Sequence, residues 1–406
     1  MTHLTCTLFS RTFTVAVLAL TVATGAWAQT EKILHSFTNG SDGGFPVGSL
    51  ILDGKGNLYG TTATGGNGVN CPCGTVFQLV PASNGTWTKN ILYSFSSSST
   101  LADGIVPEGP LVFDSKGNLY GTATAGGTNF SGVVFELTPA SGGTWTETTL
   151  YSFTNGSDGR DPFAGVVFDS AGNLYGGASG GTSGFGLIFE LVKGTNGTWT
   201  QKTLYNFSGG NDGANPSGTL SFDKAGNIYG VAQTSGAHDY GAVFELSPSS
   251  SGNWTEKVLY SFPGGYGGSY PQGGLLWGSA GQLYGIATFN LFELLPDLSG
   301  GWTEKTLHSF TGGKDGADAL GALIFDKSGN LYGTTFFGGS HRGSVFELSP
   351  SSSGTWTEKI LHRFSSNGTD GINPGVAVTL DSAGNLYGTT GQGGTSNGGV
   401  VFEVMP

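Results

Sequence analysis

A five-residue motif, Gly-Asn-Leu-Tyr-Gly, recurs seven times along the chain and restricts its possible folds more than any other feature. Five copies are identical, one reads Gly-Asn-Ile-Tyr-Gly and one reads Gly-Gln-Leu-Tyr-Gly. The copies begin at Gly56, Gly117, Gly172, Gly226, Gly281, Gly329 and Gly384. Successive copies are 61, 55, 54, 55, 48 and 55 residues apart. A fixed period near 50 residues indicates a propeller, a solenoid or an array.

Each period contains four short strand signals separated by turn residues. In the second period these are residues 111–113, 118–122, 133–137 and 145–153, and apolar and polar residues alternate along the last of them. Four such strands make one blade of a β-propeller. We therefore predict an all-β fold, a seven-bladed β-propeller of four-stranded blades, as a single domain of residues 29–406.

The composition excludes the main alternative classes. Of the 406 residues, 74 are Gly, 12% are aromatic and only 11% are charged. A disordered chain would have fewer aromatic and more charged residues. A helix bundle would be rich in Ala, Glu, Lys and Leu, and collagen would have Gly at every third position.

The lengths of the connections predict how the ring closes. The Asp-x-x-Gly-Asn and Pro-x-x-x-Gly turns are tight and belong within a blade, whereas a longer loop must cross to the next blade. The mature chain starts at residues 32–37 with an outermost-strand sequence and ends at residues 400–404 with a third-strand sequence. We predict that the N-terminal strand completes the last blade.

Two segments of the repeat resemble a known family. The Gly-Asn-Leu-Tyr-Gly-Thr-Thr and Val-Phe-Glu-Leu-x-Pro segments resemble the GloVer tandem repeat of the choice-of-anchor proteins in bacterial secretomes. The order Pro-x-Gly, then Asp-x-x-Gly-Asn-Leu-Tyr, is also similar to NHL-type propeller repeats. The resemblance covers residues 31–406 and implies a propeller fold and secretion, but no particular reaction.

The N-terminus has the pattern of a secretory signal peptide. Arg11 precedes an apolar stretch at residues 12–25, and Ala26-Trp27-Ala28 fits the small-x-small cleavage rule. We predict a signal peptide at residues 1–28, no membrane span, and a secreted, periplasmic or cell-surface location. The formal net charge is −12 without clusters of Lys or Arg, which argues against nucleic acid as a partner. We expect a monomer.

Two cysteines remain after the predicted cleavage. Cys71 and Cys73 flank Pro72, and a disulfide that closes this loop fits an oxidising compartment. Metal or redox chemistry and free thiols are the alternatives, although two thiolates alone do not make a structural zinc site. We predict no metal and no cofactor.

Residues that recur in every period are expected to build the blades. A Phe in each third strand is predicted to pack blade against blade, and a Trp that begins each outermost strand has the same structural role or, alternatively, stacks on sugars. His35, His308 and His362 replace a Tyr of the other periods, so we interpret them as structural or surface residues. The loops that cross between blades repeat Asp-Gly. We expect this Asp to accept a hydrogen bond from its own downstream backbone and the Gly to adopt positive φ. A calcium site is the alternative, although the loops lack a closing Glu.

Departures from the repeat identify the candidate binding residues. The fifth period is short because it has lost most of the loop between Ile286 and Leu291, which would expose neighbouring aromatic side chains. The unusual residues of the long loops are Arg160, Asp161, His238, Asp239, Tyr240, Tyr266, Tyr270, His341 and Arg342. Both long loops of each blade should lie on one face, where binding residues on a rigid scaffold are expected.

Three functions are compatible with this pattern. We favour a secreted, non-catalytic binding module for a polysaccharide or a cell-surface component. The second is a glycan lyase or hydrolase that uses the candidates of the fourth and sixth periods as acid, base and charge-stabilising groups. Such a site requires these side chains to converge near one substrate. The third is a structural surface or matrix protein.

Overall fold

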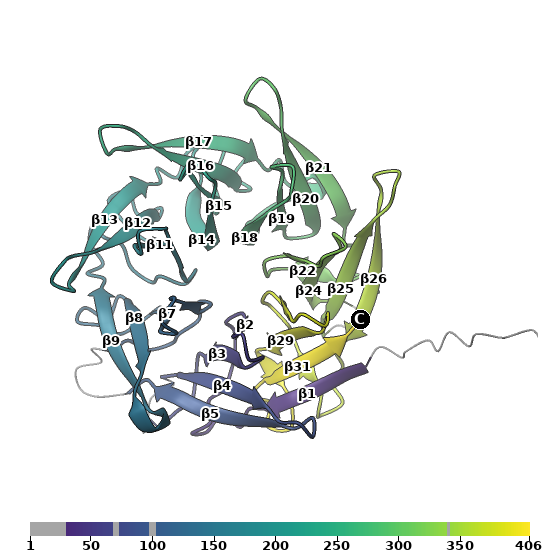
Figure 1. The fold of residues 1–406 in the computed structure, drawn as a ribbon. Coiled ribbons are helices and arrows are strands. Elements are labelled where there is room, and N and C mark those ends of the chain that lie inside the picture. The colour runs from purple at the N-terminus through teal and green to yellow at the C-terminus, as the bar shows by residue number, and fades with distance from the viewer. Residues whose placement is uncertain (1–29, 68–72, 97–102, 339–341) are drawn as a thin grey trace, which may run out of the picture.

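The four strand signals of each period form one antiparallel sheet, and seven such blades surround a central axis (Figure 1). The computed structural model describes residues 30–67, 73–96, 103–338 and 342–406. The predicted signal peptide, Cys71 and His341 lie outside the described residues. In the described part of the chain, no helix is long and apolar enough to cross a membrane.

The strand order within each blade follows the predicted one, from the innermost strand to the outermost. Blade 1 consists of β2 (Ile51–Leu52), β3 (Leu58–Thr62), β4 (Thr75–Pro81) and β5 (Trp87–Ser94). Blade 2 consists of β6 (Val112–Phe113), β7 (Leu119–Ala123), β8 (Val133–Pro139) and β9 (Trp145–Ser152). Blade 3 consists of β10 (Val166–Phe168), β11 (Leu174–Ala178), β12 (Leu187–Lys193) and β13 (Trp199–Asn206). Blade 4 consists of β14 (Ala214–Phe222), β15 (Ile228–Thr234), β16 (Ala242–Pro248) and β17 (Trp254–Ser261). Blade 5 consists of β18 (Pro271–Trp277), β19 (Leu283–Ala287), β20 (Asn290–Pro296) and β21 (Trp302–Ser309). Blade 6 consists of β22 (Ala317–Ala319), β23 (Ile324–Phe325), β24 (Leu331–Phe337), β25 (Ser344–Pro350) and β26 (Trp356–Arg363).

The seventh blade joins the two ends of the described chain. Its strands are β28 (Thr379–Leu380), β29 (Leu386–Thr390), β31 (Val400–Met405) and, outermost, β1 (Thr30–Ser36). The short strands β27 (Gly371–Ile372) and β30 (Gln392–Gly393) pair beside it. In Figure 1 the purple N-terminal strand lies against the yellow C-terminal strand, which confirms the predicted closure.

The two positions of the repeated motif that are always Gly require glycine for different physical reasons. The first lies in the tight turn with φ between 82° and 97°, a region that L side chains rarely adopt. The second lies in the second strand, directly under the aromatic ring of the third strand. A Cβ on Gly121, for example, would lie 2.6 Å from the Phe135 ring. The motif therefore combines a turn requirement with a packing requirement.

Aromatic side chains hold neighbouring blades together, as predicted. At every interface the Phe that ends one outermost strand packs against the third-strand Phe of the next blade, with ring centroids 5.1–5.3 Å apart. Burial of each ring contributes roughly 2–3 kcal/mol. The repeated Trp is half-buried and packs on the preceding blade; Trp87, for example, contacts Tyr387 at 5.8 Å. This position supports the structural interpretation of the Trp set.

Candidate ligand-binding face

The two long loops of each blade lie side by side on one face of the ring. We call the loop that joins the outermost strand of one blade to the next blade the crossing loop. Isolated backbone bridges join it to the loop between the second and third strands, as in Ile105–Ala125 and Arg160–Ser179. The prediction that both loops share one face is confirmed, and this surface is called the long-loop face below.

At one shared position near its end, each crossing loop has a non-glycine residue in the left-handed conformation, which we call the entry residue; Asn39 and Asn155 adopt this conformation earlier in their loops. The seven entry residues, all in the described part of the chain, have φ between 47° and 61°. They are Phe45, Val106, Asp161, Asn215, Tyr270, Asp318 and Asn373. A non-glycine residue in this region is uncommon, and a bulky or β-branched one is an outlier. Strain of about 1–3 kcal/mol at such positions often marks a functional surface.

A backbone hydrogen bond to the preceding blade holds each crossing loop in place, and the donor depends on whether Pro follows the entry residue. Six of the seven precede Pro, and each of these six donates its backbone N–H to a carbonyl of the preceding blade, as Tyr270 does to Tyr240 at 2.7 Å. In blade 6 the next residue is Ala319. Because Ala has the N–H that Pro lacks, Ala319 itself donates to Thr288 at 3.1 Å. The same inter-blade contact is therefore kept by a different donor.

The residue two positions after each entry residue faces the ring axis, with its side chain or, for Gly375, its backbone. These seven positions, together with the residues that follow them, line a cavity of about 340 Å³. The positions are Val47, Glu108, Phe163, Ser217, Gln272, Leu320 and Gly375. Among the described residues that line the cavity, Glu108 is the only charged one, and burial raises the pKa of its carboxyl group. The central channel is therefore mainly apolar, with one carboxyl group and a few neutral polar groups.

Exposed aromatic residues lie on the long loops of several blades, Phe45 and Phe130 among them, and blades 3 to 5 have several more. Phe185, Tyr240 and Phe289 lie at the tips of the loops between the second and third strands, and each is partly exposed. Tyr240 contacts the entry residue Tyr270 edge to face, with ring centroids 5.8 Å apart. Tyr240 and Tyr270 are 38% and 41% exposed, so each presents both an apolar surface and a hydroxyl group. We call Phe185, Tyr240, Tyr270 and Phe289 the aromatic group.

The loop between the second and third strands of blade 5 is short, as the sequence indicates. Only Thr288 and Phe289 connect β19 to β20. Tyr266 is 98% exposed in the neighbouring 3-10 turn (Gly265–Gly267), and its carbonyl oxygen accepts a hydrogen bond from the Asn290 side chain at 2.7 Å. That the short loop causes this exposure stays a prediction.

The other predicted site residues do not form a single centre. Arg160 and Asp161 pair with each other at 3.7 Å on blade 3. His238 and Asp239 lie in an exposed turn of blade 4, whereas Arg342 lies on blade 6. Within the described ranges, no hydrogen bond or ion pair joins the blade 4 residues to Arg342. The convergence that an enzyme of the predicted kind requires is therefore not seen among these described residues.

The cysteine and aspartate predictions have different outcomes. Cys73 is fully buried and disulfide-bonded. Its predicted pairing with Cys71 stays a prediction because Cys71 lies outside the described residues. The crossing-loop aspartates do hold their turns, but the predicted donors were wrong: Asp158 accepts from the backbone N–H of Thr154 at 2.9 Å and from the Tyr151 hydroxyl at 2.8 Å, both upstream. The following Gly159 has the expected positive φ, 89°.

Of the seven entry residues, the sequence indicated Asp161 and Tyr270 as candidates, whereas the other five and Glu108 were missed. The available signal was the x-Pro-x tripeptide in six crossing loops, which places a variable residue on each side of a fixed Pro. The variable residue before Pro is the entry residue, and the one after it reaches the channel. Because these positions differ among blades while their backbone is the same, they suit recognition of an asymmetric ligand.

Comparison with known proteins identifies the family. The model of the Gloeobacter/Verrucomicrobia repeat matches residues 16–176, 143–293 and 290–406. The chain belongs to this family. Comparison with curated protein sequences gives no match. The Gloeobacter/Verrucomicrobia repeats of this chain therefore have to be compared with other propellers through their fold.

Solved structures share that fold at low sequence identity. Virginiamycin B lyase from Staphylococcus aureus is 14% identical, with 93% of this chain and 99% of that chain covered and a TM-score of 0.56. A catalytically inactive variant of the same lyase with quinupristin has the same values. The periplasmic gluconolactonase of Pseudomonas aeruginosa is 14% identical, with coverages of 80% and 90% and a TM-score of 0.51. Similarity at this level shows the propeller fold alone.

Proposed function

We propose that the protein is a secreted or periplasmic binding module that recognises a polysaccharide or a cell-surface glycan through the long-loop face. The observation that carries this proposal is the aromatic group on the long-loop face, whose member Tyr270 lies in a crossing loop that continues to the central channel. Tyrosine rings with one exposed face and a free edge suit the apolar faces and hydroxyl groups of sugars. The entry residue Tyr270 links the two features, because Gln272 lies two positions further on and lines the channel.

The chemistry of the channel favours binding over catalysis. General acid–base catalysis usually needs two titratable groups within reach of one substrate. Among the described lining residues, Glu108 is the one titratable group, and Ser217, Thr219 and Gln272 offer only neutral hydrogen-bonding groups. A cavity of this size fits a short segment of a ligand. The two similar structures are a lyase and a lactonase, so release of product remains the outcome to test against.

A glycan array and a panel of soluble polysaccharides test the proposal with residues 29–406. We expect retention without release of product. The variants Tyr240→Ala and Tyr270→Ala should each weaken binding at least about 10-fold, through loss of stacking area. Leu298→Ala is the matched control, because Leu298 is a fully exposed apolar residue in the tight turn between β20 and β21.

Two results would contradict the proposal. Retention that both tyrosine variants leave unchanged would place the site elsewhere on the ring. Release of product by the wild type, abolished by Glu108→Gln, would instead support an enzyme with its site in the channel.

A further inference from the structure

A three-residue cluster recurs where neighbouring blades meet. It consists of a Tyr or His of one outermost strand, the Asp of the following crossing loop, and a residue near the start of the next blade's outermost strand. Between blades 1 and 2 these are Tyr93, Asp103 and Glu147. The Tyr93 hydroxyl donates to Asp103 Oδ2 at 2.8 Å, while Asp103 Oδ1 is buried without a hydrogen-bond partner.

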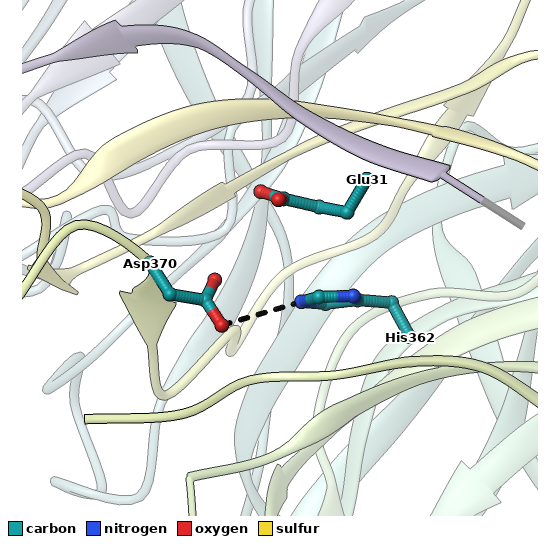
Figure 2. A group of neighbouring side chains, drawn as sticks. All are labelled: Glu31, His362 and Asp370. Carbon is teal, nitrogen blue, oxygen red and sulfur yellow. Dashed lines mark ion pairs between the residues drawn. The ribbon is translucent and has the colours of Figure 1, made fainter. Parts of the chain in front are cut away.

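Between blades 6 and 7 the cluster consists of Glu31, His362 and Asp370. One donor atom from each of the three residues lies within 4.8 Å of the other two, and within the described ranges no other group of three or more His, Cys, Asp and Glu side chains is this close. Figure 2 shows the three side chains, from three separate segments, pointing into the same space. The His362 Nε2 and the Asp370 Oδ2 are 3.4 Å apart.

All three residues have a buried polar atom without a hydrogen-bond partner. These atoms are Glu31 Oε1, His362 Nε2 and Asp370 Oδ1. The Asp370 side chain is only 7% exposed, and its other oxygen accepts the backbone N–H of Ser365 at 2.8 Å. Buried polar atoms are rarely left unpaired, so three of them facing one another require a missing partner. Their chemistry, one imidazole nitrogen and two carboxylates, indicates a cation.

The neighbouring interface shows how a cluster of this kind can contain its own positive charge. Between blades 7 and 1, the position of Glu31 is occupied by Lys89, beside His35 and Asp42. The Lys89 ammonium group donates to the Asp42 backbone carbonyl, so this cluster contains its own cation. The cluster between blades 6 and 7 has a Glu at this position, as four other interfaces do, so it combines two carboxyl groups with an imidazole and has no ammonium group of its own.

We propose that Glu31, His362 and Asp370 bind a divalent transition-metal ion, Zn²⁺ in the first place, and that this ion clamps β1 to blade 6. An imidazole with two carboxylates suits Zn²⁺ and disfavours Ca²⁺ and Mg²⁺, which prefer oxygen ligands alone. Ligand atoms around tetrahedral Zn²⁺ at about 2.0–2.2 Å lie roughly 3.4 Å apart. His362 Nε2 and Asp370 Oδ2 already have this spacing, and Oδ2 is the oxygen that also accepts the backbone N–H of Ser365.

The third ligand needs only a small movement. The Glu31 carboxylate must move inward by about 1 Å, through its own side-chain torsions, for its oxygen to reach the ion. Water completes the four-coordinate shell. The ion joins strand β1, the crossing loop after β26 and the outermost strand of blade 6, so metal binding stabilises the closure of the ring.

A similar cluster between blades 5 and 6 provides a matched control within the same chain. His308 and Glu358 are 3.9 Å apart there, but both oxygens of Asp315 accept hydrogen bonds from Thr311. His308 Nε2 and Glu358 Oε1 are buried without a hydrogen-bond partner, like the matching atoms of the first cluster, so the two clusters differ in the aspartate, which here is satisfied by its own loop. We expect no tight metal binding at this second cluster.

The test uses tag-free protein of residues 29–406, dialysed against chelator and titrated with Zn²⁺ by calorimetry. We expect one Zn²⁺ per chain and a Tm raised by about 2–4 °C at saturation. His362→Tyr introduces the residue of four other blades, and Glu31→Gln keeps the size of the side chain. Each should weaken Zn²⁺ binding at least 10-fold, while His308→Tyr leaves it unchanged. Co²⁺ should give a visible d–d band that is absent in His362→Tyr.

Each other outcome overturns the proposal. Wild-type protein that binds no stoichiometric Zn²⁺ at 100-fold molar excess would show that a proton, and not a metal ion, resolves the cluster. Equal binding by the wild type and Glu31→Gln would exclude the proposed ligand set. Loss of binding in His308→Tyr would move the site to the neighbouring interface. If His362→Tyr fails to fold by circular dichroism, Glu31→Gln decides.

Discussion

The glutamate near the start of five of the seven outermost strands couples stability to pH. Burial raises the pKa of Glu147 to about 7, with Asp103 adding to the effect and the Thr149 hydroxyl opposing it. The ordinary value of about 4.5 applies to the unfolded chain. Below pH 4.5 both states are protonated, and the stabilising contribution is complete. Between pH 4.5 and 7 the unfolded state releases its proton first, so this contribution is lost as the pH rises through the folded pKa.

Glu147→Gln should remove this pH dependence. Blade 3 already has Gln201 at the same position, donating to Thr203 at 3.1 Å, so the amide is compatible with the site. We expect the variant to be more stable than the wild type at pH 8 by on the order of 1 kcal/mol, after allowance for partial exposure, and unchanged at pH 4. Urea denaturation across this range measures the difference. The reverse change, Gln201→Glu, should introduce the same slope, and a flat profile there would contradict this explanation.

The entry residues allow a test of backbone strain. Val106 is β-branched and has φ of 61°, whereas Asn occupies the same position in two other blades. Because Asn tolerates the left-handed region far better than Val, Val106→Asn should stabilise the fold by about 1 kcal/mol. Asn215→Val should destabilise it by a similar amount. Calorimetric Tm values compare the two; if both shift in the same direction, strain at this position is not the cause.

At the scale of the strand, two adjacent glycines of β11 allow the effect of tight packing to be measured separately from the effect of glycine on the freedom of the unfolded chain. A Cβ on Gly176 would lie 2.7 Å from the Phe189 ring, whereas one on Gly177 would make ordinary contacts of 3.4–3.5 Å with Pro216. Gly176→Ala should therefore cost about 1–3 kcal/mol through overpacking. Gly177→Ala should be neutral or stabilise by up to about 1 kcal/mol, because it reduces the freedom of the unfolded chain. Chemical denaturation of both variants checks the contrast, and equal losses would refute it.

The strands could be predicted from the sequence because their signals are local and repeated seven times. Alternation, turn residues and connection lengths all act within about 50 residues, and they also predicted the pairing of β1 with β31. Five of the seven entry residues were missed because a left-handed residue before Pro depends on a carbonyl of the preceding blade. The Glu31–His362–Asp370 cluster was missed because Glu31 is far from the other two residues in the sequence. The interchange of His362 with Tyr also indicated a structural residue.

At the scale of the whole molecule, the chain crosses every interface between neighbouring blades covalently, because β1 completes blade 7 and then continues into blade 1. Blades 1 to 6 are each followed by a crossing loop. Blade 7 connects to blade 1 through β1, which pairs with β31 from Thr30–Met405 to Ser36–Val400. Opening of the ring at this interface therefore requires the removal of β1 from its sheet. The closure should act mainly on the rate of unfolding.

Two circular permutants test this role of the closure. The first starts at residue 39, continues to residue 406, and returns to residues 29–38 through a copy of the turn at residues 82–86. Blade 7 is then one continuous hairpin set, and its interface with blade 1 has no covalent crossing. The second has the same joint but opens in the turn at residues 82–86, so that β5 becomes the N-terminal closing strand. Both should give the circular dichroism of the wild type. In guanidinium with chelator present, the first should unfold on the order of 10-fold faster than the wild type, whereas the second should match it. Equal rates for the two permutants would mean that packing between blades, and not the exchanged strand, limits the opening of the ring.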